Sequence, residues 1–114
     1  MVYYSKKDEE YNYQYVSKWE SARLKVSDNE KMTVENLIYA ALVGSANNAV
    51  ESLVRLSGLT RNEFIAKMNE SVKNWDAVNT SFIEPTGLSP KNVSSAMDYA
   101  IIIKEAMKYF ILVL

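Results

Sequence analysis

The sequence predicts an α-rich fold of the α+β class, with about four helices and short extended segments at the N-terminal end. Apolar residues recur at helical spacing between residues 33 and 109. Residues that favour the starts and ends of helices interrupt this pattern. The first 26 residues are unlike the rest, and the stretch YNYQYV within them alternates aromatic and polar side chains. We therefore expect an extended, tyrosine-rich arm over residues 1–26 and a helical part over residues 27–114.

The arm contains two alternating stretches. In YNYQYV, the alternation places Tyr11, Tyr13 and Tyr15 on one face of an extended strand. Residues 22–26 alternate in the same way and predict another short strand or an extended piece. Such a segment is expected to cover an edge of the core, because tyrosine combines apolar area with a polar tip; a binding strip is the alternative. The charged run over residues 6–10 is expected to be a solvated face or tail.

Two helices are expected between residues 33 and 58. Thr33 is suited to cap the first, whose apolar stripe runs to Leu42 and should end at Gly44. A second stripe begins at Ala46 and stops at Gly58, the residue type that most readily adopts the left-handed conformation after a helix. The stretch LVGSANNAVE therefore lies at a corner between two helices, or at a kink within one.

Caps also mark the third and fourth helices. Thr60 and Glu63 have the spacing of a capping box, and the helix that they begin should end near residues 74–77. Residues 78–92 contain two prolines and a glycine, which predict an ordered loop. Ser95 should then cap the last helix. The inward stripe of the third helix is expected to comprise Phe64, Ile65, Met68, Val72 and Trp75.

The composition excludes several classes of function. The chain has neither Cys nor His, so it cannot form a disulfide, a thiolate zinc site or a catalytic Ser-His or Cys-His pair. No metal site or cofactor is expected. A net charge of -1 without clustered basic residues disfavours nucleic acid as a partner. The apolar run YFILVL at the C-terminal end is far shorter than the roughly 20 residues that cross a bilayer, and the N-terminal residues lack the pattern of a signal peptide.

The helix corner carries the candidate site, Ser45 and Asn47. Two interpretations of these residues are open from their types and spacing. In the first, Ser45 is the N-cap of the second helix and Asn47 is an ordinary polar corner residue. In the second, the hydroxyl and the carboxamide are presented to a ligand.

Together with its neighbouring segments, this corner resembles a known family. MTVENLIYAALVGSANNAVESL, residues 32–53, looks like the helix, Ser-x-Asn corner and following helix of the serine D-alanyl-D-alanine carboxypeptidases. These are low-molecular-mass penicillin-binding proteins of the β-lactamase-like fold. Residues 64–88 are similar to the family segment with Met-Asn, Thr-x-Phe and Pro-Thr-Gly-Leu, and residues 94–100 echo its Ser/Thr-Ala-x-Asp helix start. The resemblance covers roughly residues 21–109 and implies the helical subdomain of that fold.

The resemblance implies acyl transfer on the peptidoglycan stem peptide by an extracytoplasmic parent enzyme, periplasmic or at the cell surface and membrane-associated. The family uses three motifs around one cleft, Ser-x-x-Lys, Ser-x-Asn and Lys-Thr-Gly. Ser45 and Asn47 match the second motif. By this resemblance, the Ser45 hydroxyl takes part in the proton relay to the leaving group. Asn47 is expected to bond the peptide group of the substrate and the lysine beside the nucleophile.

The first and third motifs are absent. No serine has a lysine three positions later, and the nearest pair, Ser52 and Arg55, offers a guanidinium that cannot act as a base. The Pro-Thr-Gly of residues 85–87 lacks the lysine of the third motif, and Asn48 stands where the family usually has aspartate. Because nucleophile, base and anchor act as a unit, the chain alone is expected to be inactive, as an excised piece or a truncated gene product.

Two functions therefore remain open from the sequence. The chain is either a piece of a serine carboxypeptidase that contributes the Ser-x-Asn element, or a non-catalytic helical interaction module. In the second case it self-associates or pairs with another chain through its arm and the apolar tail YFILVL, because consecutive exposed apolar residues favour association.

Overall fold

The computed structural model describes the backbone of residues 1–113 and the side chains of residues 1–109. Two short strands, β1 (Val2–Tyr3) and β2 (Lys31–Met32), pair antiparallel. A 3-10 turn follows α1. The α-helices are α1 (Lys7–Glu10), α2 (Val34–Leu42), α3 (Asn47–Leu56), α4 (Arg61–Asn74) and α5 (Ala96–Val113). The fold is therefore α-rich with short extended segments at the N-terminal end, which confirms the predicted class.

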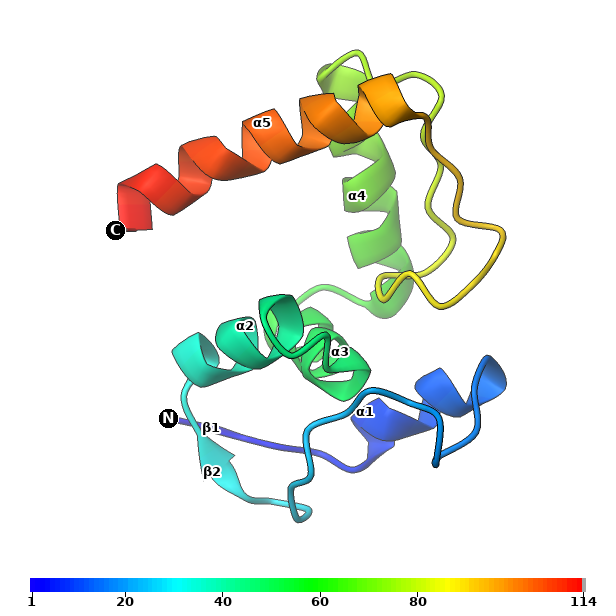
Figure 1. Ribbon diagram of the computed structural model, residues 1–114. Coiled ribbons are helices and arrows are strands. Elements are labelled where there is room, and N and C mark those ends of the chain that lie inside the picture. The colour runs from blue at the N-terminus through cyan, green and yellow to red at the C-terminus, as the bar shows by residue number, and fades with distance from the viewer. Residues whose placement is uncertain (114) are drawn as a thin grey trace.

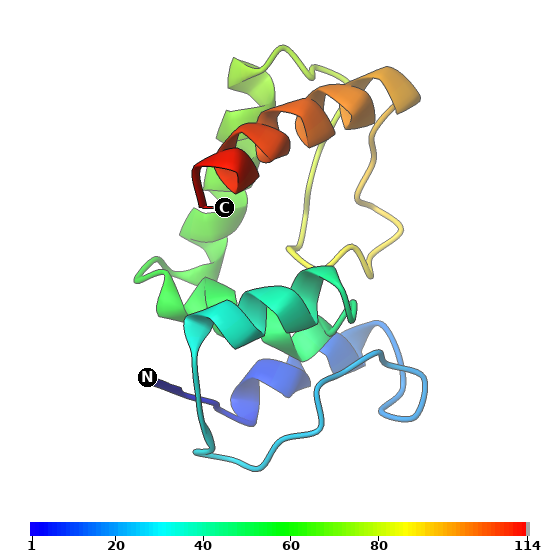
Figure 2. The same cartoon turned by 60° about the vertical axis from the view of Figure 1, so that its left-hand side comes forward.

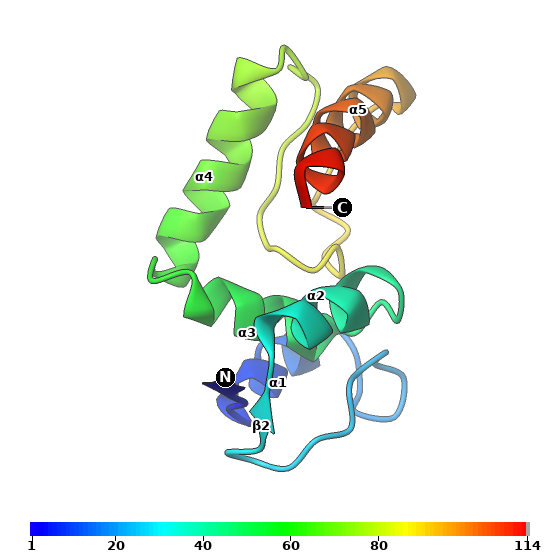
Figure 3. The same cartoon turned by 90° about the vertical axis from the view of Figure 1, so that its left-hand side faces the viewer.

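The helices form an open arrangement. In Figure 1 the strands and α1 to α3 make the lower part, α4 rises from the end of α3, and α5 crosses at the top. Leu37, Ala46 and Ala49 form a small buried core between α2 and α3. The radius of gyration is 14.4 Å, against about 13 Å for a compact domain of this length. Figure 3 shows α4 and α5 apart with the connecting loop between them, whereas in the view of Figure 2 α5 crosses in front of α4.

The strand predicted from the tyrosine alternation is wrong. Residues 7–10 form α1 and residues 12–14 the 3-10 turn, whereas residues 22–26 are irregular. A helical turn lets the Tyr13 hydroxyl donate to Glu9 Oε2, four residues earlier, at 2.9 Å. The charged run is not solvated throughout either, because Asp8 and Glu9 are only 2% and 3% exposed. The division of the chain at residue 26 stays a prediction.

The helix caps predicted at Thr33, Thr60 and Ser95 are confirmed. Thr33 and Ser95 each accept a hydrogen bond from the backbone N–H three residues later, at 3.0 and 3.1 Å. Thr60 and Glu63 form a complete capping box at the start of α4. Gly58 follows α3 with a φ of +83°. These helices begin and end where predicted because local side chains satisfy backbone groups that the helix leaves without partners.

Two apolar surfaces were predicted, the inward stripe of the third helix and the C-terminal tail, and the structure describes only the first of them. In the expected inward stripe of α4, Val72 is buried and the other four residues are half-buried. The side chains after Tyr109 lie outside the described residues, and so does the predicted contact through the tail YFILVL.

Candidate functional site

A tight reversal of the backbone forms the corner between α2 and α3. The Ala46 N–H donates to the Ala40 carbonyl at 3.0 Å, and a Cβ on Gly44 would come within 2.9 Å of the same oxygen. Glycine is therefore the residue that fits there. Ser45 follows with a left-handed φ of +53° and is exposed. Ala46, not Ser45, occupies the N-cap position of α3, so the capping interpretation of Ser45 is wrong.

Asn47 is the first residue of α3, and the irregular segment of residues 22–26 holds its carboxamide. Its backbone N–H donates to the Ala22 carbonyl at 2.9 Å, and its side-chain Nδ2 donates to the same oxygen at 3.2 Å. The residue is 8% exposed. The side chain is thus oriented by the chain itself rather than free in solvent, two positions after the exposed Ser45.

Asn48 is fully buried and joins three segments. The Leu24 N–H donates to Asn48 Oδ1 and Asn48 Nδ2 donates to the Leu24 carbonyl, both at 2.8 Å. Nδ2 also lies 3.1 Å from the Tyr4 hydroxyl and 3.4 Å from Glu9 Oε1, and burial raises the pKa of Tyr4. A carboxylate cannot donate to the Leu24 carbonyl or to Glu9. This explains physically why an amide stands where the family usually has aspartate.

Sequence reasoning missed the buried ion pairs beneath this corner. Asp8 accepts from the Ser52 hydroxyl at 2.7 Å and from Arg55 Nε at 3.1 Å. Glu9 pairs with Arg23 at 3.2 Å. The Ser52 and Arg55 pair that came nearest to the first motif is therefore structural. Asn48 and Ser52 are four residues apart and therefore lie on one side of α3. This spacing could have indicated a polar stripe on the helix, but not which segment covers it.

A second ion pair with a buried carboxylate, between Glu51 and Arg61, joins α3 to α4. Arg61 binds Glu51 through Nη2 at 3.0 Å. Burial raises the pKa of Glu51, and the hydrogen bond and charge of Arg61 oppose that rise. This carboxylate is held by its cation and serves as a link between two helices.

The loop that contains Pro-Thr-Gly is organised around Glu84, which is 1% exposed. Its carboxylate accepts hydrogen bonds from the backbone N–H and hydroxyl of Thr86, from the Ser89 N–H and from Asn92 Nδ2. Burial alone would raise the pKa of Glu84, but these donors lower it below its ordinary value. Gly87 has a φ of +85°. The segment is therefore a structural turn, not a copy of the third motif.

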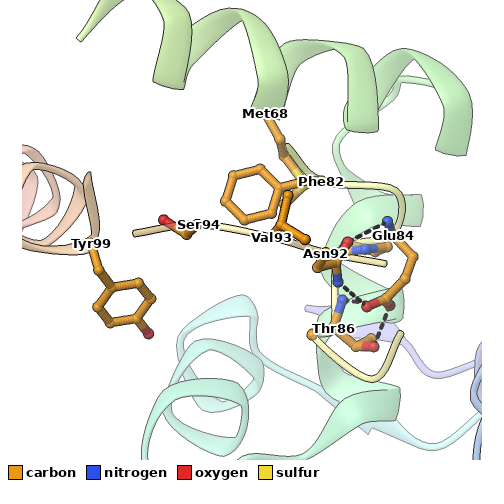
Figure 4. Close-up of a pocket in the computed structure, with 10 residues that line it drawn as sticks. Met68, Phe82, Glu84, Thr86, Asn92, Val93, Ser94 and Tyr99 are labelled. Carbon is orange, nitrogen blue, oxygen red and sulfur yellow. Dashed lines mark hydrogen bonds between the residues drawn. The ribbon is translucent and has the colours of Figure 1, made fainter. Parts of the chain in front are cut away.

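A cavity of about 300 Å³ lies beside this loop (Figure 4). Neither Ser45 nor Asn47 lines it. Its polar groups Glu84, Thr86 and Asn92 bond to one another within the loop. The structure thus keeps the cavity apart from the predicted site residues. The other lining residues are Met68, Phe82, Pro85, Gly87, Val93, Ser94 and Tyr99.

The described part of the chain holds no group of three or more acidic residues arranged to bind a metal ion. No helix within residues 1–113 is both long and apolar enough to cross a bilayer.

The profile of peptidase S11, the family described as D-alanyl-D-alanine carboxypeptidase, matches residues 4–114. The chain belongs to the peptidase S11 family. Its Ser45 and Asn47 fall within the matched residues, and the resemblance inferred from the motifs is thereby confirmed.

Curated relatives of this S11 chain carry two kinds of name. D-alanyl-D-alanine carboxypeptidase DacF of Bacillus subtilis is 38% identical over 81 residues, which are 70% of this chain and 21% of the relative. The D-alanyl-D-alanine endopeptidase of Haemophilus influenzae is 39% identical over 74 residues, 65% of this chain and 25% of the relative. The endopeptidase of Escherichia coli is 35% identical over 81 residues, 71% of this chain and 26% of the relative.

The fold of this S11 chain is also found in a solved structure. A crystal structure of an evolved penicillin-binding protein homologue from Mycobacterium tuberculosis superposes with a TM-score of 0.72 at 25% identity. The match covers 94% of this chain and 38% of that one. The S11 chain thus spans about a quarter of the length of its curated relatives and somewhat over a third of its structural neighbour.

Proposed function

We propose that this chain supplies the Ser-x-Asn element of a serine-type D-Ala-D-Ala carboxypeptidase that trims peptidoglycan peptides. The observation that carries the proposal is the corner itself. Ser45 is exposed on a left-handed turn, and Asn47, two positions later, is held by two hydrogen bonds to the Ala22 carbonyl. An exposed hydroxyl can pass a proton to a leaving group when a base beside it supplies the driving force, and a fixed carboxamide can orient the groups that react.

The Ser45 hydroxyl and the Asn47 carboxamide have different roles in this proposal. The Ser45 hydroxyl passes a proton towards the leaving amine. Since Asn47 Nδ2 is bonded to Ala22, its Oδ1 is the atom that accepts from the lysine beside the nucleophile. The nucleophile, that lysine and the cation of the third motif lie outside this sequence. The chain is therefore inactive by itself, and the enzyme acts where peptidoglycan lies, outside the cytoplasm.

A chimeric enzyme tests this role. In the Bacillus subtilis relative DacF, this chain replaces the matching segment, and acylation by a fluorescent penicillin is timed. We expect the chimera to be labelled and Ser45→Ala to slow labelling by about 100-fold or more, the size of a lost proton-transfer group. Ser81→Ala, an exposed serine elsewhere, is the matched control. A Ser45→Ala chimera that labels as fast as the control would overturn the proposed role.

The alternative function is a non-catalytic interaction module that self-associates. Exposed apolar side chains on α2 and α5, such as Leu42 and Ile103 at 60% and 51%, are the observation in its favour. Light scattering of the isolated chain distinguishes the two. A concentration-dependent dimer favours the module, and a monomer argues against it.

A further inference from the structure

Trp19 lies on an exposed turn that leads towards the Ser-x-Asn corner. The backbone N–H groups of Glu20 and Ser21 both donate to the Ser17 carbonyl at 3.1 Å, which closes the turn around Trp19. Residues 17–20 are all exposed. Trp19 itself is 90% exposed, more than any other large apolar residue in the described part of the chain. The indole therefore contributes almost no buried area to this fold.

Hydrogen bonds fix the end of this turn at the candidate site. Ala22 follows Trp19 by three positions, and its carbonyl accepts from the backbone N–H and from Nδ2 of Asn47, at 2.9 and 3.2 Å. Since consecutive Cα atoms are about 3.8 Å apart, the Cα atoms of Trp19 and Ala22 are separated by at most about 11 Å. The connectivity of the chain thus keeps the exposed indole close to Asn47.

A second exposed apolar side chain lies beside the corner on the other segment. Val43 directly follows α2, two positions before Ser45, and is 81% exposed. Apart from the terminal Met1, Trp19 and Val43 are the most exposed large apolar residues in the part of the chain that the structure describes. Single exposed apolar residues are common on protein surfaces. These two, however, belong to the two segments that meet where Ala22 binds Asn47.

We propose that Trp19 and Val43 are specificity-determining residues, which bind the stem peptide on the N-terminal side of the bond that is cleaved. The inference rests on the proposed function and names the part of the substrate that the site recognises. A carboxypeptidase removes only the last residue, so nearly all of its peptide substrate lies on that side. An indole offers a large, rigid apolar surface with one polar group, which suits a peptide of mixed polarity. Binding energy from such remote contacts can be used to accelerate the reaction at the scissile bond.

The test compares two substrates of the chimera with DacF, the complete stem peptide and acetyl-D-Ala-D-Ala, which lacks the remote part. The measured quantity is the ratio of kcat/KM for the long substrate to kcat/KM for the short one. We expect Trp19→Ala to lower this ratio by about tenfold or more, the size of a lost binding hot spot. Trp19→Phe keeps an aromatic ring and should restore most of the ratio, and Val43→Ala should lower it by less. Val78→Ala, at a 74% exposed site between α4 and α5, is the matched control.

A ratio that Trp19→Ala leaves at the value of the Val78→Ala control would overturn the inference. A Trp19→Ala chimera with a lower Tm than that control would also overturn it, because the indole would then be buried against protein rather than open to the substrate.

Calorimetric binding of the stem peptide to the chimera separates this inference from the proposed function. A chimera that penicillin does not label, but that binds the peptide about tenfold more tightly than its Trp19→Ala variant, supports the peptide contact and contradicts the proposed function. A chimera that is labelled in a Ser45-dependent way, but whose ratio and peptide affinity do not depend on Trp19, supports the proposed function and overturns this inference. A chimera that fails to fold, or that neither is labelled nor binds the peptide, contradicts both.

Discussion

The Asn48 carboxamide closes a pair of 2.8 Å hydrogen bonds with the backbone of Leu24 and reaches Tyr4 and Glu9 with its remaining donor capacity. These contacts bring the N-terminal segment and residues 22–24 against the start of α3. Asn47 adds its own two bonds to Ala22. The position of the Ser45 corner thus depends on residues more than twenty positions earlier in the chain.

Replacing this amide by a carboxylate should destabilise the protein. Asn48→Asp removes the donor to the Leu24 carbonyl and places a second carboxylate within 3.4 Å of Glu9 Oε1. We expect the free energy of unfolding to fall by about 2–4 kcal/mol, the range for a buried unsatisfied or like-charged group. Urea denaturation measures the change. Asn36→Asp, at an exposed site, should be nearly neutral; equal effects of the two would contradict the role of Asn48.

Glu84 predicts a specific dependence of stability on pH. Its folded-state pKa is lowered from the ordinary value of 4.5. Its contribution is therefore fully present above the unfolded-state pKa and is lost as pH falls through the lower, folded-state pKa. Glu84→Gln should be less stable at neutral pH by about 1–3 kcal/mol, because some donors of the loop lose their acceptor.

The measurement is the free energy of unfolding of both proteins from neutral pH to about pH 3, where the difference should shrink. Taking the difference removes the effect of Glu51, whose raised pKa acts in the opposite direction in both proteins. A difference that stays constant across this range would show that the Glu84 carboxylate is not stabilised by the fold.

At the scale of the element, α3 is buried on two sides. Its apolar side packs on α2 around Leu37. Its polar side is covered by α1, where the Ser52 hydroxyl donates to Asp8. The caps of α2 and α4 could be predicted from the sequence because each depends on residues three positions apart. The helical conformation of residues 7–14 could not, because its buried carboxylates find their cations on distant segments.

The burial of α1 can be tested with one pair of isosteric variants. Asp8→Asn removes the charge that pairs with Arg55 at 3.1 Å and accepts from Ser52. We expect a loss of about 2 kcal/mol in the free energy of unfolding, since the partner arginine is partly exposed and can be solvated. Glu10→Gln, an exposed neighbour on the same helix, is the control. A loss no larger than that of the control would restore the prediction of a solvated charged run.

At the scale of the whole molecule, the order of several motifs predicted the fold class and the family. The Ser-x-Asn corner, the capping box of α4 and the cap of α5 are local signals, so each was visible in the sequence. The network around Asn48 was not, because it joins residues 24 to 44 positions apart. Periodicity also predicted inward stripes on α4 that the structure buries only in part.

We propose that this chain carries only one motif of a three-motif site, and this proposal can be tested directly. Its most direct test is incubation of the intact, isolated chain with a fluorescent penicillin, followed by measurement of the mass of the whole protein, with full-length DacF as the positive control. We expect labelling of DacF and no covalent adduct on this chain, since it has no Ser-x-x-Lys pair. A stoichiometric penicillin adduct on the isolated chain would contradict it.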